Sequence, residues 1–170
     1  MKLENYIKDV KDFPIEGIIF KDITPLLCDK DAFKEAIDEL TMWAKGVGAN
    51  KVVGPDARGF IIGCPVAYAL NAGFVPVRKP HKLPRETIDI TYDLEYGTNS
   101  LSMHKDALKK GDKVVIIDDL LATGGTIVAT IKLCEQLGAE VVGVGVLIEL
   151  VDLKGKENIK GIEVKSLLKY

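Results

Sequence analysis

The chain of 170 residues has the length of one domain, and we expect residues 1–170 to form a single unit. Hydrophobic residues make up 47% and charged residues 28%, which excludes a disordered chain. The net charge of −2 argues against nucleic-acid or membrane binding, and no apolar run reaches the roughly 18–20 residues of a membrane span, so we expect a cytoplasmic protein. Cys28, Cys64 and Cys134 have no metal-ligand spacing and are predicted to be buried free thiols.

The first half of the chain contains two units in which a helix leads into a strand. Helices are predicted at 31–47 and 60–70, and strands at 51–54 and 74–77. Pro65 predicts a kink or an early turn in the second helix, and Gly73 is expected to close it.

The second half begins with an alternating segment and continues with apolar runs. Residues 87–94 alternate in polarity before a turn at 97–99, which predicts an antiparallel hairpin. The continuous apolar run 113–118 is typical of a parallel strand covered on both faces. A helix at 127–134 and a strand at 141–148 complete an α/β pattern, with a mainly parallel twisted sheet and a ligand crevice at the carboxyl ends of its strands.

The segment 114–126 joins a buried strand to a loop rich in glycine and threonine. Backbone N–H groups and hydroxyls of such a loop at a helix N-terminus can bind one phosphate. Asp118 and Asp119 precede the loop; near a phosphate their carboxylates would serve sugar hydroxyls or a magnesium ion. A helix cap with a turn is the simpler alternative. The residues predicted to bind ribose 5-phosphate are Asp118, Asp119, Ala122, Thr123, Gly124, Gly125 and Thr126.

This segment resembles the phosphoribosyl pyrophosphate signature of the type I phosphoribosyltransferase family. The resemblance implies the family's fold, in which a small N-terminal hood, here about residues 1–30, and a flexible hairpin flap flank the sheet. No Gly-x-x-x-x-Gly-Lys-Ser/Thr occurs and no strand leads into Gly-x-Gly-x-x-Gly, which argues against nucleotide kinases and dehydrogenases.

The segment 13–27 resembles the hood of the adenine-specific members. In them the backbone at Ile19, Phe20 and Lys21 contacts adenine, and Phe20 is suited to stack on a flat base, although it could be a core residue instead. Lys21 replaces the family's usual arginine. Leu150 is expected to be an apolar wall of the base pocket. Hypoxanthine-guanine enzymes have a lysine and an aromatic in the region of Leu150, and because neither occurs there we expect adenine as the substrate.

Two basic segments resemble the family's pyrophosphate-binding positions. A guanidinium can bind phosphate through two hydrogen bonds, whereas a solvated surface position is the alternative for each of these residues. Ala57 stands where the family commonly has serine, and His81 where it often has glycine. The residues assigned to pyrophosphate are Asp56, Ala57, Arg58, Arg78, Lys79 and Lys82, some of them offered across a homodimer interface that the resemblance implies.

The resemblance also implies a catalytic pair, Glu95 in the flap and Arg58. Arg58 and Mg²⁺, held mainly by substrate and through water by Asp118 and Asp119, would neutralise the departing pyrophosphate, while Glu95 manages the proton of adenine. The alternatives are specificity for hypoxanthine or guanine, and a ligand-sensing regulator of the same fold, which would need a DNA-binding appendage that this sequence does not display.

Overall fold

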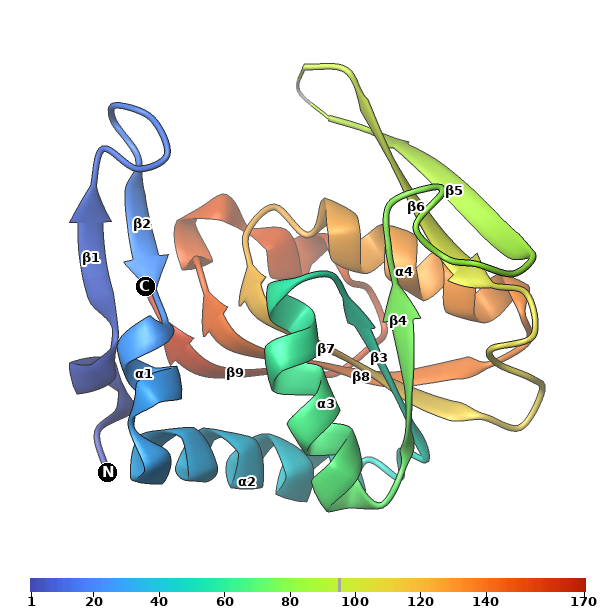
Figure 1. The fold of residues 1–170 in the computed structure, drawn as a ribbon, viewed down its shortest axis with the longest axis horizontal. Coiled ribbons are helices and arrows are strands. Elements are labelled where there is room, and N and C mark those ends of the chain that lie inside the picture. Colours follow the sequence, from blue (N-terminus) through green and yellow to red (C-terminus); the bar gives the residue numbers. More distant parts are fainter. Residues whose placement is uncertain (95) are drawn as a thin grey trace.

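A five-stranded parallel sheet forms the centre of the computed structural model, which describes residues 1–94 and 96–170 (Figure 1). The strand order is β4-β3-β7-β8-β9. The strands are β3 (Lys51–Pro55), β4 (Gly73–Val77), β7 (Lys113–Leu121), β8 (Glu140–Glu149) and β9 (Val164–Lys169). The predicted α/β class with a mainly parallel sheet is confirmed.

Helices cover both faces of this sheet. Helices α2 (Lys30–Gly46) and α3 (Arg58–Leu70) pack on one face, and α4 (Gly125–Gln136) packs on the other. The side chains of β7 alternate between the two cores, because Val114 and Ile116 join the cluster around α4 whereas Val115 and Ile117 join the cluster around α2 and α3. A strand buried on both faces needs an unbroken apolar sequence, which explains the run that starts at residue 114.

Two antiparallel hairpins stand on opposite sides of the sheet's carboxyl edge (Figure 1). The hood hairpin consists of β1 (Lys8–Lys11) and β2 (Ile19–Asp22), preceded by the 3₁₀ helix Leu3–Tyr6 and followed by α1 (Thr24–Cys28). The flap hairpin consists of β5 (Thr87–Asp93) and β6 (Thr98–His104), so the second strand begins inside the turn predicted at 97–99. Two further 3₁₀ turns, Val151–Leu153 and Gly155–Asn158, separate β8 from β9.

The helix boundaries follow from local capping. The Asp29 carboxylate accepts the N–H groups of Asp31 and Ala32 and thereby starts α2. Helix α3 passes through Pro65 and ends at Leu70, where Asn71 adopts the left-handed conformation with φ of 56°. The prediction that Gly73 closes α3 was therefore wrong, since asparagine also tolerates the left-handed region.

The structure differs from the sequence predictions at two further points. Strand β9 was not predicted. Cys28 and Cys64 are exposed, and of the three cysteines only Cys134 is buried. No helix within 1–94 and 96–170 is both long enough and apolar enough to pass through a lipid bilayer.

Candidate active site

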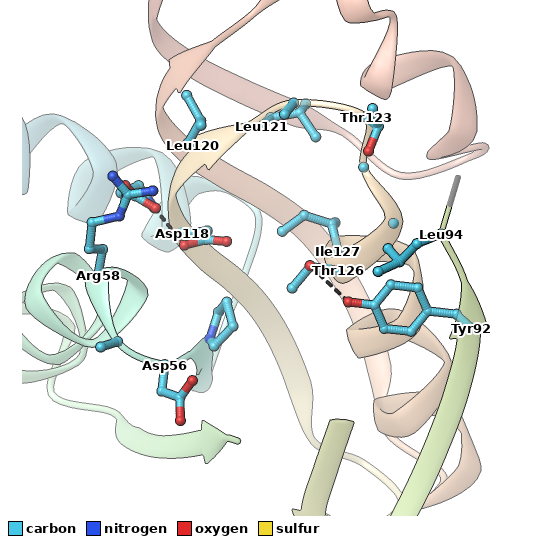
Figure 2. Close-up of a pocket in the computed structure, with 16 residues that line it drawn as sticks. Asp56, Arg58, Tyr92, Leu94, Asp118, Leu120, Leu121, Thr123, Thr126 and Ile127 are labelled. Atoms are coloured by element: carbon cyan, nitrogen blue, oxygen red, sulfur yellow. Dashed lines mark hydrogen bonds and ion pairs between the residues drawn. The ribbon is translucent and has the colours of Figure 1, made fainter. Parts of the chain in front are cut away.

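A cavity of about 500 Å³ opens where the strand order reverses. From β3 the chain first forms β4 on one side and later returns to place β7 on the other side, and such a switch point leaves a crevice beyond the carboxyl ends of the two strands. The cavity is lined by residues 55–58 at the end of β3 and the start of α3, by residues 118–127 from the end of β7 to the first turn of α4, and by Tyr92 and Leu94 of the flap hairpin (Figure 2).

The predicted phosphate loop borders this cavity. Strand β7 extends to Leu121, so Asp118 and Asp119 lie within the strand and not beyond its end as the sequence suggested. The loop turns at Gly124, which has a φ of 89°, and α4 begins at Gly125. The first N–H groups of a helix have no partner within the helix, and the positive end of the helix dipole adds to their attraction for an anion.

A later segment supports the loop from behind. The Asn158 amide donates a hydrogen bond to the carbonyl of Thr123 at 2.9 Å. A Cβ atom on Gly124 would lie 2.9 Å from the carbonyl oxygen of Gly155, so the two backbones touch. Sequence reasoning missed both supporting residues, because no local motif marks them.

Asp118 is buried against the first turn of α3. Its Oδ1 accepts the N–H of Asp119 at 2.8 Å and would lie 2.9 Å from a Cβ on Gly59, which is why residue 59 must be small. The pKa of Asp118 is raised well above its usual value, first because burial penalises the charged carboxylate and then because Asp119 is close; Arg58 acts in the opposite direction.

Arg58 connects the large cavity to a second one. Its Nε lies 3.0 Å from Asp119 Oδ2, and its guanidinium carbon lies 5.1 Å from the centre of the Phe20 ring. Asp119 is 7% exposed whereas Arg58 is 42% exposed, so the pair spans from the sheet to solvent. Arginine over an aromatic face is a favourable cation–π arrangement.

The second cavity measures about 110 Å³ and brings together all four residues assigned to adenine. Ile19, Phe20, Lys21 and Leu150 line it, together with Arg58, Asp119 and the apolar side chains of Ile18, Ile23, Leu120 and Ile148, which sequence reasoning did not single out. The ammonium of Lys21 is engaged elsewhere, because it lies 2.6 Å from Asp9 Oδ1 and 4.1 Å from the centre of the Tyr170 ring.

The basic stretch around Arg78 is only partly joined to the cavity. Arg78 Nε pairs with Asp56 Oδ2 at 3.0 Å, and Asp56 and Ala57 line the cavity, with a cis peptide bond between them. Lys79 and Lys82 are exposed, and among the residues described neither they nor Arg78 line the cavity. Glu95, assigned to catalysis, lies outside the described residues.

Comparisons with known proteins agree with this arrangement. A family profile described as a phosphoribosyl transferase domain matches residues 29–167. An adenine phosphoribosyltransferase from Lactobacillus gasseri is 59% identical over 167 residues, which cover 98% of this chain and 95% of that protein.

Two crystal structures show the same fold over nearly the whole chain. Adenine phosphoribosyltransferase from Thermoanaerobacter pseudethanolicus is 50% identical with a TM-score of 0.96, and the match covers 99% of this chain and 98% of the other. The enzyme from Saccharomyces cerevisiae, crystallised with an imino-altritol bisphosphate and adenine, is 36% identical with a TM-score of 0.93 over 98% and 97% of the two chains. The switch-point cavity, its glycine-rich loop and these matches together place the chain in the phosphoribosyl transferase family.

Proposed function

We propose that the protein is an adenine phosphoribosyltransferase of purine salvage, which transfers the 5-phosphoribosyl group of phosphoribosyl pyrophosphate to N9 of adenine and releases AMP and pyrophosphate. The observation that carries this proposal is the connection of a phosphate-loop cavity to an apolar cavity through the Arg58–Asp119 pair. Two substrates bound in these cavities would meet beside that pair. The full-length relatives that bear this activity in their names support the same conclusion.

The loop from Ala122 to Thr126 binds the 5-phosphate through its N–H groups and hydroxyls. Asp118 and Asp119 lie in β7, shortly before this loop, and accept hydrogen bonds from the ribose hydroxyls. Because both aspartates project from a rigid central strand, the sugar is held in a defined orientation, which is how such enzymes lower the entropy cost of the reaction.

The turn 56–58 holds the pyrophosphate beside the sugar. Among the described residues Arg58 is the one basic side chain that lines the cavity, and it gives charge-assisted hydrogen bonds as the pyrophosphate departs. Arg78, through Asp56, positions this turn, whereas Lys79 and Lys82 supply positive charge at its rim or toward a second copy of the chain.

The acidic pair also fits a magnesium ion that is held mainly by substrate. Within the described residues no group of three or more His, Cys, Asp or Glu side chains converges on a metal position. Two neighbouring carboxylates suit Mg²⁺, which keeps several waters and takes its other ligands from phosphates. Asp118 and Asp119 would reach such an ion through water, and the bound ion would supply charge neutralisation of the pyrophosphate.

The apolar cavity selects a purine by shape and by backbone hydrogen bonds. Phe20 offers an aromatic face, and Leu150 is one of the apolar side chains that line the same cavity. The Lys21 side chain does not take part in recognition of the base, because its ammonium is paired with Asp9. The hood backbone at Ile19 to Lys21 therefore recognises the polar edge of adenine.

The reaction breaks the bond from C1 of ribose to pyrophosphate, and the electron pair leaves with the pyrophosphate. The lone pair of N9 forms the new bond from the opposite face, with inversion, and Glu95 takes up the proton that N9 loses. The exchange of Glu95 for alanine is expected to lower kcat more than it changes KM.

The test is formation of AMP from radiolabelled adenine, phosphoribosyl pyrophosphate and Mg²⁺, with hypoxanthine and guanine as competitors. We expect AMP in the complete mixture and at most weak competition by the two 6-oxo purines. If a correctly folded preparation formed no AMP, the proposed reaction would be contradicted. A preference for hypoxanthine or guanine would contradict the proposed base specificity.

A cytoplasmic homodimer is part of the same proposal. Helix α3 exposes Ile61 at 43% and Tyr68 at 90%, together with Cys64, on one outward face, which suits a self-complementary contact with a second copy. Light scattering should give twice the chain mass, and Tyr68→Glu should shift the mass toward a monomer. A monomeric wild-type protein would contradict this part of the proposal.

A further inference from the structure

Three side chains connect both strands of the flap hairpin to the phosphate loop. The Tyr92 hydroxyl lies 3.1 Å from Thr126 Oγ1, as Figure 2 shows, and the amide nitrogen of Asn99 donates to the same Tyr92 hydroxyl at 3.1 Å. Tyr92 and Asn99 are paired across β5 and β6. The Tyr92 ring also covers Gly125, where a Cβ atom would lie 3.4 Å from the ring.

Asn99 favours one direction for these hydrogen bonds. Its Oδ1 accepts the N–H of Ser100 at 3.0 Å, so the amide nitrogen faces Tyr92 and can only donate. The Tyr92 oxygen is then an acceptor, and its own proton is available for Thr126 Oγ1. When Tyr92 donates in this way, Thr126, which lines the large cavity, has its single hydroxyl proton left for a ligand.

We propose that Tyr92 is a positioning residue for the 5-phosphate: it makes Thr126 a hydrogen-bond donor that faces the phosphate. The proposal rests on the proposed function, because it needs a phosphate in the loop. Hydrogen bonds arranged in one direction strengthen one another, so a phosphate that accepts from Thr126 also tightens the bond from Tyr92. The flap hairpin and the phosphate loop are thereby coupled by a group that does not touch the reacting atoms.

The experiment measures binding of ribose 5-phosphate by calorimetry to the wild type, Tyr92→Phe, Asn99→Ala and the double variant. Phenylalanine removes only the hydroxyl, and we expect about three- to tenfold weaker binding. Asn99→Ala should weaken binding by a smaller factor in the wild-type background. In the Tyr92→Phe background it should have no further effect, because its partner is already absent.

Ser100→Ala is the matched control. It removes the 2.8 Å hydrogen bond between the hydroxyls of Thr91 and Ser100, which form the neighbouring pair of the same hairpin. It leaves intact the two hydrogen bonds that join Asn99, Tyr92 and Thr126, which we call the relay. Its affinity for ribose 5-phosphate should equal that of the wild type. If Tyr92 had only a structural role, Tyr92→Phe would change KM for both substrates. The relay predicts instead that this variant raises KM for phosphoribosyl pyrophosphate and leaves KM for adenine unchanged.

Hydrogen exchange supplies a readout that does not depend on activity. Ribose 5-phosphate should increase protection of residues 87–94 in the wild type and in Ser100→Ala, but not in Tyr92→Phe. Equal affinity of Tyr92→Phe and wild type, or additive losses in the double variant, would overturn the relay alone. A wild-type protein that does not bind ribose 5-phosphate would overturn the phosphate loop and the proposed function with it.

Discussion

The α-carbon of Gly155 is packed against the carbonyl oxygen of Ala122, so closely that a Cβ atom on residue 155 would lie 2.2 Å from that oxygen. This contact joins the segment after β8 to the first residue of the phosphate loop. No side chain fits between them, and the neighbouring atom is backbone, which cannot rotate away.

Gly155→Ala is therefore expected to displace the phosphate loop. Overpacking of this kind costs about 1–3 kcal/mol, which we expect to be divided between lower stability and weaker binding of ribose 5-phosphate. Thermal unfolding and calorimetry measure the two parts. Lys156→Ala, at the exposed next position, is the control and should change neither. Unchanged affinity together with unchanged stability in Gly155→Ala would contradict the contact.

Asp118 should make stability depend on pH. The pKa of its carboxyl is raised by burial in the folded protein, so its favourable contribution is complete below the unfolded pKa and is lost as pH rises through the folded pKa. Asp118→Asn removes this loss. Urea unfolding from about pH 4 to about pH 8 should show a difference in free energy that grows with pH in favour of the variant.

Asp106→Asn provides the control of opposite sign. A hydrogen bond from Arg85 lowers the pKa of Asp106, whose contribution is present above the unfolded pKa and is lost as pH falls. Asp106→Asn should therefore be the less stable protein at neutral pH, by a small amount because the pair is fully exposed. A pH-independent difference for Asp118→Asn would contradict the assignment of a raised pKa.

Arg58 should not be replaceable by lysine. The guanidinium pairs with Asp119 and lies over Phe20 at once, and a compact ammonium cannot keep both contacts. Because loss of a charge-assisted hydrogen bond corresponds to a factor of about 10 to 100, Arg58→Lys should lower kcat/KM by that factor. Arg85→Lys, in which the arginine forms an exposed pair with Asp106, should retain wild-type kinetics. Equal rates for Arg58→Lys and wild type would contradict the role of the guanidinium.

Gly145→Ala should destabilise the core between the sheet and α2. A Cβ atom there would lie 2.8 Å from the Trp43 ring and 2.9 Å from Ile117 Cδ1, so about 1–3 kcal/mol of stability should be lost in urea unfolding. Gly46→Ala is the contrasting change, because no described atom outside its own helix backbone and its chain neighbours lies within 4 Å of its Cβ position. It should be neutral or stabilise α2 by up to about 1 kcal/mol. A Gly145→Ala protein with the same free energy of unfolding as the wild type would contradict this packing.

The sequence was sufficient to single out the glycine-rich loop that borders the cavity, because the parts of this loop are contiguous. A buried strand, two acids, two glycines and a helix start lie within 114–126, so local chemistry was sufficient. The extent of β7 was missed because Asp118 and Asp119 break the apolar pattern. They remain in the strand because Gly59 leaves room for one carboxylate and Arg58 pairs with the other.

What the sequence did not reveal depends on contacts between distant segments. Gly155 and Asn158 support the loop from more than thirty positions away, and Tyr92 reaches it from the flap. Strand β9 mixes lysine and serine with leucine at an edge of the sheet, so no strict alternation marks it. The exposure of Cys64 was missed because α3 is apolar on most sides, and periodicity then fails to distinguish its faces.

The position of β7 between β3 and β8 has a consequence for the newly made chain on the ribosome. When residue 126 emerges from the ribosome, β7 can pair only with β3, since β8 and the turn that contains Gly155 have not yet emerged. Parallel strands need such distant partners before they are stable. Under the proposed function, the loop is therefore complete only after β8 and Gly155 have emerged, and we expect that a truncated product that stops soon after the glycine-rich loop carries the signature without retaining a sugar phosphate.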